Sequence, residues 1–358
     1  MIDSPRERVL AAINHQPVDR VPTDYWGTLE VTQMLLDHLG CETEIEMYDR
    51  LGIDGILGVV PPYIGPILND CEESPRQALE AWGMRFERQE YADGVYWEQS
   101  FHPLADAETI EDLESCAWPD PDWYDYEELA RQCALYPDRA VSVGYTAVFY
   151  YHNMLRGLEL SLMDPLLRPE FTHHLIQRIS DVFTEYHRRC FEAGRGRIDI
   201  TQVTDDWGSQ NGLITSPQIF EEFYRAPTQR AIDLAKSFDI IVFHHDDGDM
   251  RPLLPTWVEM GIDVLNPVQW RCGNWDLAAL KAEFGHQICF HGGVDNQQTL
   301  PFQTQDDVRT EVKRLIALLG KDRTGFIIAP CHNIQPNTPI ENIITLYEAA
   351  HEFGTFNG

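Results

Sequence analysis

The sequence contains no run of about 18 consecutive apolar residues, and this excludes an ordinary transmembrane helix. Its opening stretch, MIDSPRERVLAAINHQP, has no apolar signal-peptide region and instead predicts a helix that Ser4 caps and Pro5 begins. The eight cysteines are scattered, and none lies in a CxxC pair. In the absence of an export signal, this cysteine usage predicts reduced thiols and a cytoplasmic protein.

Basic residues are also scarce. The chain has 27 lysines and arginines against 58 aspartates and glutamates, which gives a formal net charge of −31. Such a field repels phosphate backbones, so we expect no nucleic-acid partner. The acidic residues are not gathered in one tail, and they predict a well-solvated surface without identifying a substrate.

What the sequence does contain is an alternation of short apolar segments and amphipathic stretches of helical period. Continuous apolar strands that alternate with helices predict a parallel sheet covered on both faces, and about eight such units favour a (β/α)8 TIM barrel. No GxGxxG motif follows the first segment, which weakens the dinucleotide-binding alternative. The predicted strands lie at 21–26, 53–62, 140–146, 198–210, 240–249, 262–269, 287–295 and 325–333.

One segment breaks the alternation. Residues 83–101 contain two β-like runs around Ala92-Asp93-Gly94, which is the signature of a hairpin. Together with the Trp-, Pro- and Asp-rich stretch that follows, they predict an insertion after the second strand, at about 63–135. No linker or internal repeat divides the chain, so we expect residues 1–358 to form a single decorated barrel domain.

In such barrels the functional side chains collect at the carboxyl ends of the strands, here called the rim. A single polar residue after a strand is ordinarily a loop or helix cap, but here ligand and acid–base types recur after nearly every predicted strand, and we expect one shared site. The expected substrate-binding residues are Asp24, Tyr25, Trp26, Tyr145, Gln210, Asn266, Gln269 and His291. The expected catalytic residues are Asp205, Asp206 and His332.

The stretch FHHDDGDM at 243–250 indicates a metal site. His245 and Asp247 are alternate residues of an extended segment, so their side chains point the same way. Cys331 or His332, after the eighth strand, would complete three protein ligands and leave a position open, as in catalytic zinc sites. The other polar residues of the stretch are expected to be structural, in the barrel wall (His244) or in loops and caps (Asp246, Asp249).

Four stretches resemble the uroporphyrinogen decarboxylase superfamily, which also contains the zinc-dependent methyltransferases of corrinoid methyl-transfer systems. They are SPRERVLAAINHQPVDRVP (4–22), DDWGSQNGLITSPQIFEEFYRAP (205–227), HDDGDMRPLLPTWVEMGIDVLNPVQ (245–269) and PCHNIQPNTPIENI (330–343). They cover the chain nearly end to end, and the resemblance therefore implies the barrel fold. It also implies a homodimer.

The methyltransferase branch is similar in its zinc ligands, a His-x-Cys after the fifth strand and a Cys after the eighth. Aligned on Gly248, the histidine is kept as His245 and the first cysteine is replaced by Asp247. Aligned on PNTP, the second cysteine position falls on His332, with Cys331 one residue before it. A carboxylate in place of a thiolate leaves a harder metal, which suits an oxygen substrate better than a thiol acceptor.

The decarboxylase branch resembles the chain in fold but differs at the mouth of the barrel. That branch grips its polyanionic substrate with an arginine-rich motif after the first strand, whereas residues 24–30 here contain no arginine. Pro61 and Pro62 stand where its catalytic aspartate is expected, although His332 matches its active-site histidine. The resemblance is therefore closer to the methyltransferase branch.

The leading hypothesis is a zinc-dependent methyltransferase that moves a methyl group between a small methylated substrate and a corrinoid protein or other acceptor. Asp205 or Asp206 would position the substrate or relay a proton, between walls formed by Tyr25, Trp26 and Tyr145. The second hypothesis is a metal-free decarboxylase or lyase in which histidine and aspartate act on a carboxylated substrate as acid and base. The third is a barrel that only binds a ligand.

Overall fold

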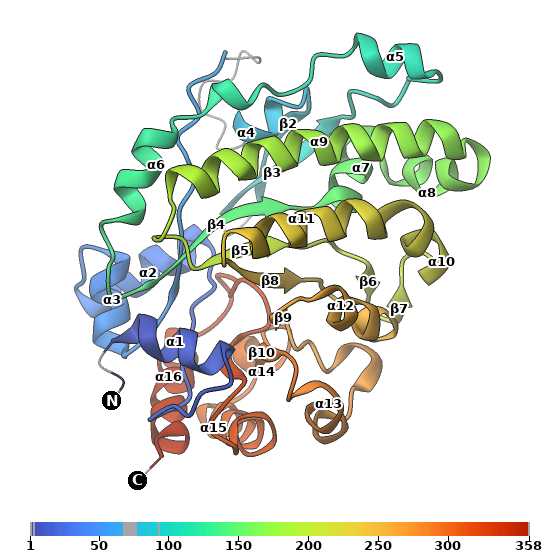
Figure 1. The fold of residues 1–358 in the computed structure, drawn as a ribbon. Coiled ribbons are helices and arrows are strands. Elements are labelled where there is room, and N and C mark those ends of the chain that lie inside the picture. The colour runs from blue at the N-terminus through green and yellow to red at the C-terminus, as the bar shows by residue number, and fades with distance from the viewer. Residues whose placement is uncertain (1, 3, 67–76, 92–93, 357–358) are drawn as a thin grey trace.

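Seven parallel strands form one curled sheet in the computed structural model (Figure 1). The structure describes residues 2, 4–66, 77–91 and 94–356. Across the sheet the strands are β1 (Ile56–Gly58), β4 (Ala140–Thr146), β5 (Ile200–Val203), β8 (Ile241–His245), β9 (Val264–Asn266), β10 (Cys289–Val294) and β11 (Phe326–Pro330). Each lies inside one of the predicted strand segments, and the parallel, TIM-barrel-like α/β architecture is confirmed.

The predicted strand at 21–26 is wrong in its extent. It is reduced to an isolated parallel bridge between Thr23 and Ile328 of β11. On its other side the Thr23 carbonyl accepts the backbone N–H groups of Asp54 and Gly55, just before β1. The ladder stops there because the Thr23 N–H donates to the Asp54 carboxylate, at 3.0 Å, instead of to a strand. The segment nevertheless lies between β11 and β1, the two edges of the sheet.

Helices cover the outer face of the sheet, and α9 and α11 lie side by side over β4, β5 and β8 (Figure 1). The longer helices are α1 (Pro5–Ile13), α2 (Leu29–Leu39), α3 (Glu44–Leu51), α7 (Val148–Arg156), α8 (Leu158–Leu167), α9 (Pro169–Ala193), α11 (Arg225–Ser237), α12 (Leu254–Met260), α13 (Leu277–Phe284), α15 (Gln305–Leu315) and α16 (Ile340–Gly354). Shorter elements are β6 (Gly208–Ser209), β7 (Gly212–Leu213), α10 (Pro217–Ile219), α14 (Thr299–Phe302) and helical turns at 220–224, 251–253, 272–274 and 316–320.

The first helix closes the amino-terminal end of the sheet. Ser4 caps α1 as predicted, by accepting the N–H of Glu7 at 3.2 Å. Val9 and Ile13 of α1 belong to a buried apolar cluster with side chains from the beginnings of the strands, among them Ile200 and Ile327. Because this end is filled with apolar side chains, the polar residues at the opposite strand ends are left as the rim.

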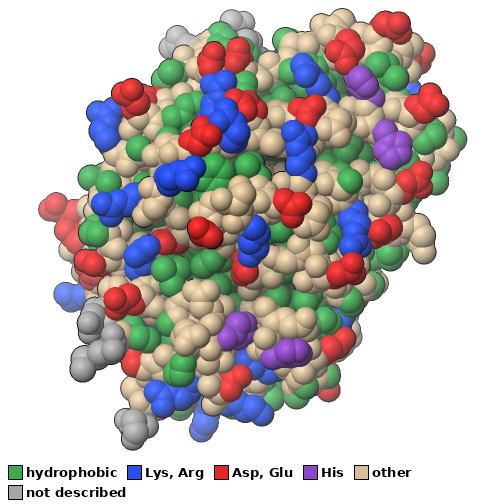
Figure 2. Space-filling model, in the orientation of Figure 1, with side chains coloured by type: hydrophobic (Ala, Val, Ile, Leu, Met, Phe, Trp, Pro, Cys, Tyr) green, Lys and Arg blue, Asp and Glu red, His purple; other side chains and the backbone are tan. Residues whose placement is uncertain are grey.

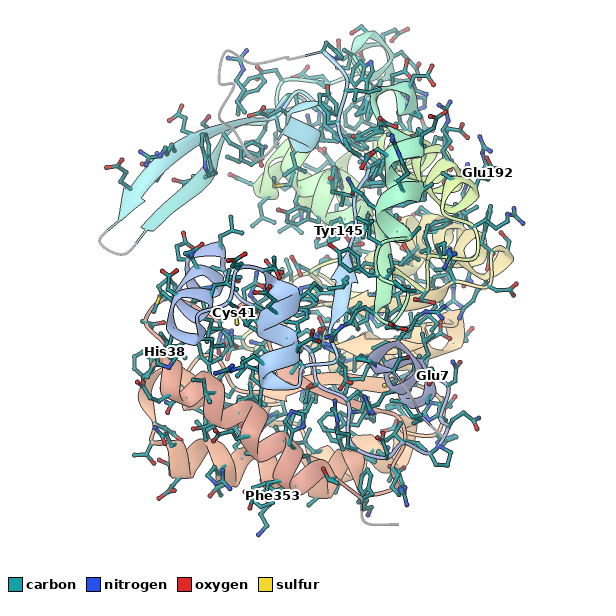
Figure 3. The ribbon with its side chains drawn as sticks, turned by 90° about the vertical axis from the view of Figure 1, so that its left-hand side faces the viewer. Glu7, His38, Cys41, Tyr145, Glu192 and Phe353 are labelled. Atoms are coloured by element: carbon teal, nitrogen blue, oxygen red, sulfur yellow. The ribbon has the colours of Figure 1, made fainter. Side chains whose placement is uncertain are left out.

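Between β1 and β4 lie α4 (Gln77–Glu80), β2 (Arg85–Tyr91), β3 (Gly94–Phe101), α5 (Ile110–Ser115), a 3-10 turn (Pro121–Trp123) and α6 (Tyr126–Cys133). β2 and β3 pair antiparallel, and Figure 3 shows them projecting from the body of the molecule. Two residues of the predicted turn, Ala92 and Asp93, lie outside the described residues.

On the face that Figure 2 shows, acidic and basic side chains are interspersed with apolar ones. Within the described ranges, no helix has the length and apolar character needed to cross a bilayer. The cysteines that the structure describes all have free thiols.

Candidate metal centre and adjoining cavity

Two loops at the rim are held together by glycines. β8 ends at His245, and the chain turns away at Gly248, whose φ of +82° is a conformation that glycine adopts at low cost. The loop after β5 lies so close that a Cβ added to Gly208 would be 2.2 Å from the carbonyl oxygen of Asp247. This close packing places Asp206, on the β5 loop, next to Asp247 on the β8 loop.

Three predicted site residues converge at this point, and we call His245, Asp247 and His332 the metal group. Their potential ligand atoms all lie within 4.8 Å of one another. Nε2 of His332, which follows β11, is 3.4 Å from Oδ2 of Asp247, and Nε2 of His245 is 3.8 Å from Oδ1 of the same carboxylate. Two imidazoles and one carboxylate form a donor set used by catalytic zinc sites with an open position.

Asp206 adds a second carboxylate beside the metal group. Its Oδ1 lies 3.9 Å from Nε2 of His245. Oδ1 of Asp206 and Oδ1 of Asp247 are both buried and accept no hydrogen bond from any residue that the structure describes. Burial raises the pKa of Asp206, against the opposite effect of nearby His245. Buried carboxylate oxygens without donors cost free energy unless a cation or a proton lies between them, so these residues fit a divalent metal ion.

Cys331 lies apart from the metal group although it directly precedes His332. Its side chain is buried, and its Sγ is 3.5 Å from the carbonyl oxygen of Val268. Burial raises the pKa of this thiol well above its ordinary value. Because the thiolate is the form that binds metals, the local environment disfavours Cys331 as a ligand.

Asp205 and Asp206 are adjacent in sequence but have different surroundings. The buried Asp205 carboxylate accepts the backbone N–H of Tyr150, at 2.8 Å, in the first turn of α7. It therefore anchors the amino-terminal end of that helix. Burial raises the pKa of Asp205 well above its ordinary value. Asp205 contacts His245 only through its backbone N–H, so of this expected catalytic pair only Asp206 has its carboxylate beside the His245 imidazole.

The remaining residues of FHHDDGDM contribute to the wall and the loops. Nδ1 of buried His244 is 2.8 Å from a backbone carbonyl of β5, and burial lowers the pKa of this imidazole to about 4. Asp246 accepts the backbone N–H groups of Trp207 and the next residue, which ties the β5 loop to the β8 loop. Asp249 accepts the indole N–H of Trp275 at 2.7 Å.

A buried chain of hydrogen bonds runs from Asp24 to His245. Nε2 of His291 is 2.9 Å from Oδ2 of Asp24, and Nδ1 of His291 is 2.7 Å from Nδ2 of Asn266. Oδ1 of Asn266 is in turn 2.5 Å from Nδ1 of His245. Asp24, Asn266 and His291, which were expected to contact a substrate, are at most 1% exposed, and His291 bonds to both of the others. Asp24 also borders a space of about 100 Å³ together with Trp26.

Tyr25 and Trp26 point in opposite directions, as neighbours on an extended segment do. The buried Tyr25 hydroxyl bonds to Thr32 of α2, at 3.0 Å, and its ring packs against Tyr48 of α3, on the outside of the sheet. The ring centroid of Trp26 lies 5.5 Å from that of His245. Trp26 therefore adjoins the metal group, whereas Tyr25 does not.

The two predicted glutamines support loops. Oε1 of buried Gln269 accepts the N–H of Gly248 at 2.7 Å and so helps to hold the turn after β8. Gln210 is exposed, and its Oε1 is 3.2 Å from Sγ of Cys272. Neither belongs to the metal group.

A cavity of about 590 Å³ lies between the ends of β1 and β4 and the segment inserted between them. Tyr145, at the end of β4, forms part of its wall and is labelled near the middle of Figure 3. A smaller space of about 100 Å³ is bordered by Trp26 and shares Gly58, Ser142 and Gln202 with the larger cavity. The cavity therefore extends toward the interior of the sheet and Trp26.

The lining of the large cavity is aromatic and apolar. It consists of Gly58, Val59, Val60, Pro61, Pro62, Tyr63, Trp82, Pro119, Pro121, Tyr124, Ser142, Gly144, Tyr145, Tyr151, Val182, Phe183, Tyr186 and Gln202. None of these side chains carries a charge. Apart from Tyr145, the sequence did not identify them. The Trp- and Pro-rich composition after residue 101 was the available signal, but it does not tell which face the inserted segment covers.

Fold and site define a TIM-barrel-like α/β protein of an enzyme superfamily, with a polar rim beside an apolar cavity. The chain belongs to the uroporphyrinogen decarboxylase (URO-D) family, whose model matches residues 77–353. The resemblance seen in the sequence is thereby confirmed at the level of the family.

Curated relatives carry the name of the decarboxylase. The uroporphyrinogen decarboxylase of Legionella pneumophila (strain Lens) is 29% identical over 187 residues, which cover 51% of this chain and 48% of the relative. That of Chlorobium phaeobacteroides is 26% identical over 190 residues, 51% of this chain and 50% of the relative. The match thus spans about half the length of these relatives.

Solved structures of similar fold include a methyltransferase and a methionine synthase. A methyltransferase from Methanosarcina mazei has a TM-score of 0.67 and 20% identity, over 98% of this chain and 99% of that one. A B12-independent methionine synthase from Shewanella sp. W3-18-1 has a TM-score of 0.51 and 11% identity, over 93% and 96% of the two chains. At these identities the likeness shows the fold.

Proposed function

We propose that this protein is a zinc-dependent methyltransferase that moves a methyl group between a small methylated substrate and a corrinoid protein or other acceptor. The observation that carries the proposal is the metal group, in which the buried Oδ1 of Asp247 has no hydrogen-bond donor among the described residues and lies 3.8 Å from Nε2 of His245. The similarly donorless Oδ1 of Asp206 lies beside the group, 3.9 Å from the same nitrogen. The fold likeness to the Methanosarcina mazei methyltransferase supports the same class of reaction.

In this proposal His245, Asp247 and His332 would hold the metal, and His332 is preferred to Cys331 because the Cys331 thiol is buried against a backbone carbonyl. Zinc held there would supply Lewis-acid polarisation of a substrate heteroatom. A ligand set without thiolate is hard, and this favours an oxygen atom as the polarised group.

Asp206 is placed to handle the proton of the reaction. Its carboxyl group adjoins His245, and burial raises its pKa, so it holds a proton more readily than an exposed carboxyl does. Loss of a methyl group from an ether or alcohol leaves an oxygen that must gain one proton. Asp206 would donate that proton as general acid and regain it from solvent.

The cavity supplies the binding surface for the rest of the substrate. The described lining is aromatic, proline-rich and uncharged, which favours a neutral substrate with an apolar body, because a buried charge would find no counter-charge among those residues. Trp26 and Tyr145 would form walls on the path toward the metal group. Tyr25, on the outer side of the sheet, would not take part.

The test uses zinc-loaded protein with cob(I)alamin as surrogate methyl acceptor and, as donors, methanol and uncharged aliphatic and aryl methyl ethers. We expect methylcobalamin to form, as measured by its absorbance, with at least one donor. Asp247→Ala protein of unchanged circular dichroism should form none. Absence of methylcobalamin with every donor, from protein shown to carry the metal, would overturn the proposal.

A second candidate is a metal-free decarboxylase or lyase, favoured by the pairing of Asp206 with His245 as acid and base and by the names of the curated relatives. A polyanionic porphyrinogen does not suit an uncharged cavity, so the substrate would be a smaller carboxylate. Carbon dioxide release that persists fully in a metal chelator would favour this candidate over the methyltransferase.

A further inference from the structure

We propose that Asp24, acting through His291 and Asn266, fixes the tautomer of His245 and thereby sets the metal affinity of the rim. This inference rests on the proposed metal site. In the chain of hydrogen bonds, Asp24 and His291 have no bond to any of the three proposed metal ligands. Asn266 bonds to one ligand, His245, at the ring nitrogen that faces away from the metal group. All three are therefore positioning residues.

The direction of the chain is determined at Asp24. Its Oδ1 accepts the backbone N–H of Ile56 at 2.9 Å, and its Oδ2 accepts the indole N–H of Trp26 at 3.1 Å. A backbone amide and an indole can only donate, so both oxygens of Asp24 act as acceptors. The side chain is only 2% exposed, so bulk solvent has little access to these bonds.

The donor direction then passes along the chain one residue at a time. His291 must donate from Nε2 to Asp24, which leaves Nδ1 of the neutral ring as an acceptor for the Asn266 amide NH₂. The Asn266 oxygen therefore faces Nδ1 of His245, which must donate. Nε2 of His245 is left with a free lone pair, directed at Asp206 and Asp247.

This tautomer is the one that the metal group needs. An imidazole binds a metal through an unprotonated nitrogen, and a hydrogen bond from its other nitrogen fixes the ring and raises its basicity. If every hydrogen bond of the series ran in the opposite direction, His245 would carry its proton on Nε2, and that nitrogen could not bind the metal. That opposite direction would require a protonated Asp24 that donates to His291. Its two oxygens would still have to accept the Trp26 indole N–H and the Ile56 backbone N–H.

The register of the sheet places the residues of this hydrogen-bond chain next to one another. β8 and β9 pair so that His245 lies opposite Asn266. β9 and β10 pair up to Leu265 and Phe290, and the next residues along these strands are Asn266 and His291. Alignment of the three side chains thus follows from the parallel ladder, and the first segment adds Asp24 at the end.

The experiment measures two quantities, the ring tautomer of His245 by ¹⁵N NMR in zinc-free protein and the zinc affinity by competition with a chromophoric chelator. Wild-type protein should show Nδ1–H and unprotonated Nε2 at His245. Asp24→Ala and Asn266→Leu should lose this preference and bind zinc about 10- to 100-fold more weakly, the usual effect of removing a partner of a ligating histidine. Asn266→Asp keeps an oxygen acceptor for His245 and should retain both properties.

Asp249→Ala is the matched control, because Asp249 also accepts an indole N–H at the rim but has no bond to His245. In this variant the tautomer of His245 and the zinc affinity should be those of the wild type. The inference is overturned if His245 of the wild type carries its proton on Nε2, or if Asp24→Ala binds zinc as tightly as the wild type. Wild-type protein with the expected tautomer but no zinc affinity would overturn the proposed function and leave the hydrogen-bond chain supported.

Discussion

Gly208 and Asp247 lie in direct backbone contact across the rim. The contact is so close that a Cβ on Gly208 would be only 2.2 Å from the Asp247 carbonyl oxygen. Gly208→Ala should therefore push the two loops apart and weaken zinc binding, by about 10-fold or more. Gly58→Ala, where a Cβ meets nothing within 4 Å, should leave zinc affinity unchanged. Chelator competition on both variants checks this, and equal affinities would show that the loop contact does not position the metal group.

Paired substitutions can distinguish the two neighbouring candidates for the third metal ligand, Cys331 and His332. His332→Ala should weaken zinc binding by at least about 100-fold, because it removes a member of the metal group. Cys331→Ala should leave the affinity close to that of the wild type, since the buried thiol lies against a carbonyl oxygen. A large loss in Cys331→Ala, with His332→Ala unaffected, would make the cysteine the ligand.

Asp205 should make the protein less stable as the pH rises. Its carboxyl pKa is raised by burial, so the folded state binds the proton more tightly than the unfolded state does. The stabilisation is complete below the unfolded pKa of about 3.9 and is lost as the pH rises through the raised folded value. Asp205→Asn cannot ionise and keeps an oxygen for the Tyr150 N–H, so its unfolding free energy should fall less than that of the wild type between pH 5 and pH 8.

The matched variant Asp205→Ala removes the oxygen as well and, relative to Asp205→Asn, should cost about 1 kcal/mol at both pH values, the usual effect of losing a helix cap. Denaturant titrations at the two pH values measure these differences. If the asparagine variant loses as much stability with pH as the wild type, ionisation of Asp205 is not the cause.

The cavity should reject a polyanionic tetrapyrrole. Uroporphyrin carries eight carboxylates, whereas the described residues of the lining include no basic side chain and the whole chain carries a charge of −31. We expect no saturable quenching of tryptophan fluorescence by uroporphyrin at 0.15 M salt. Saturable micromolar binding that weakens in Tyr145→Ala would place this substrate in the cavity and favour the decarboxylase candidate.

The sequence was sufficient to predict the seven strands of the sheet and their order, because continuous apolar segments such as those of β8 and β11 have few alternatives once a parallel sheet is assumed. It failed at 21–26, where the Asp54 side chain takes a backbone donor that a strand would have used. That contact joins positions 31 residues apart, and no local pattern contains it.

For the site, sequence spacing could place His245 and Asp247 on one side of a strand but could not choose between Cys331 and His332. That choice depends on which side chain turns inward after β11. Asn266 and His291 were predicted as substrate contacts because both are polar and follow strands. The hydrogen bonds that join them depend on the register of β8, β9 and β10, which only the folded sheet determines.

The most direct test of the central claim is elemental analysis of protein reconstituted with zinc and freed of loosely bound metal on a desalting column. We expect about one equivalent of zinc per wild-type chain and a large loss in Asp247→Ala, at unchanged circular dichroism. Less than about a tenth of an equivalent in the wild type, with any divalent transition metal offered, would contradict it.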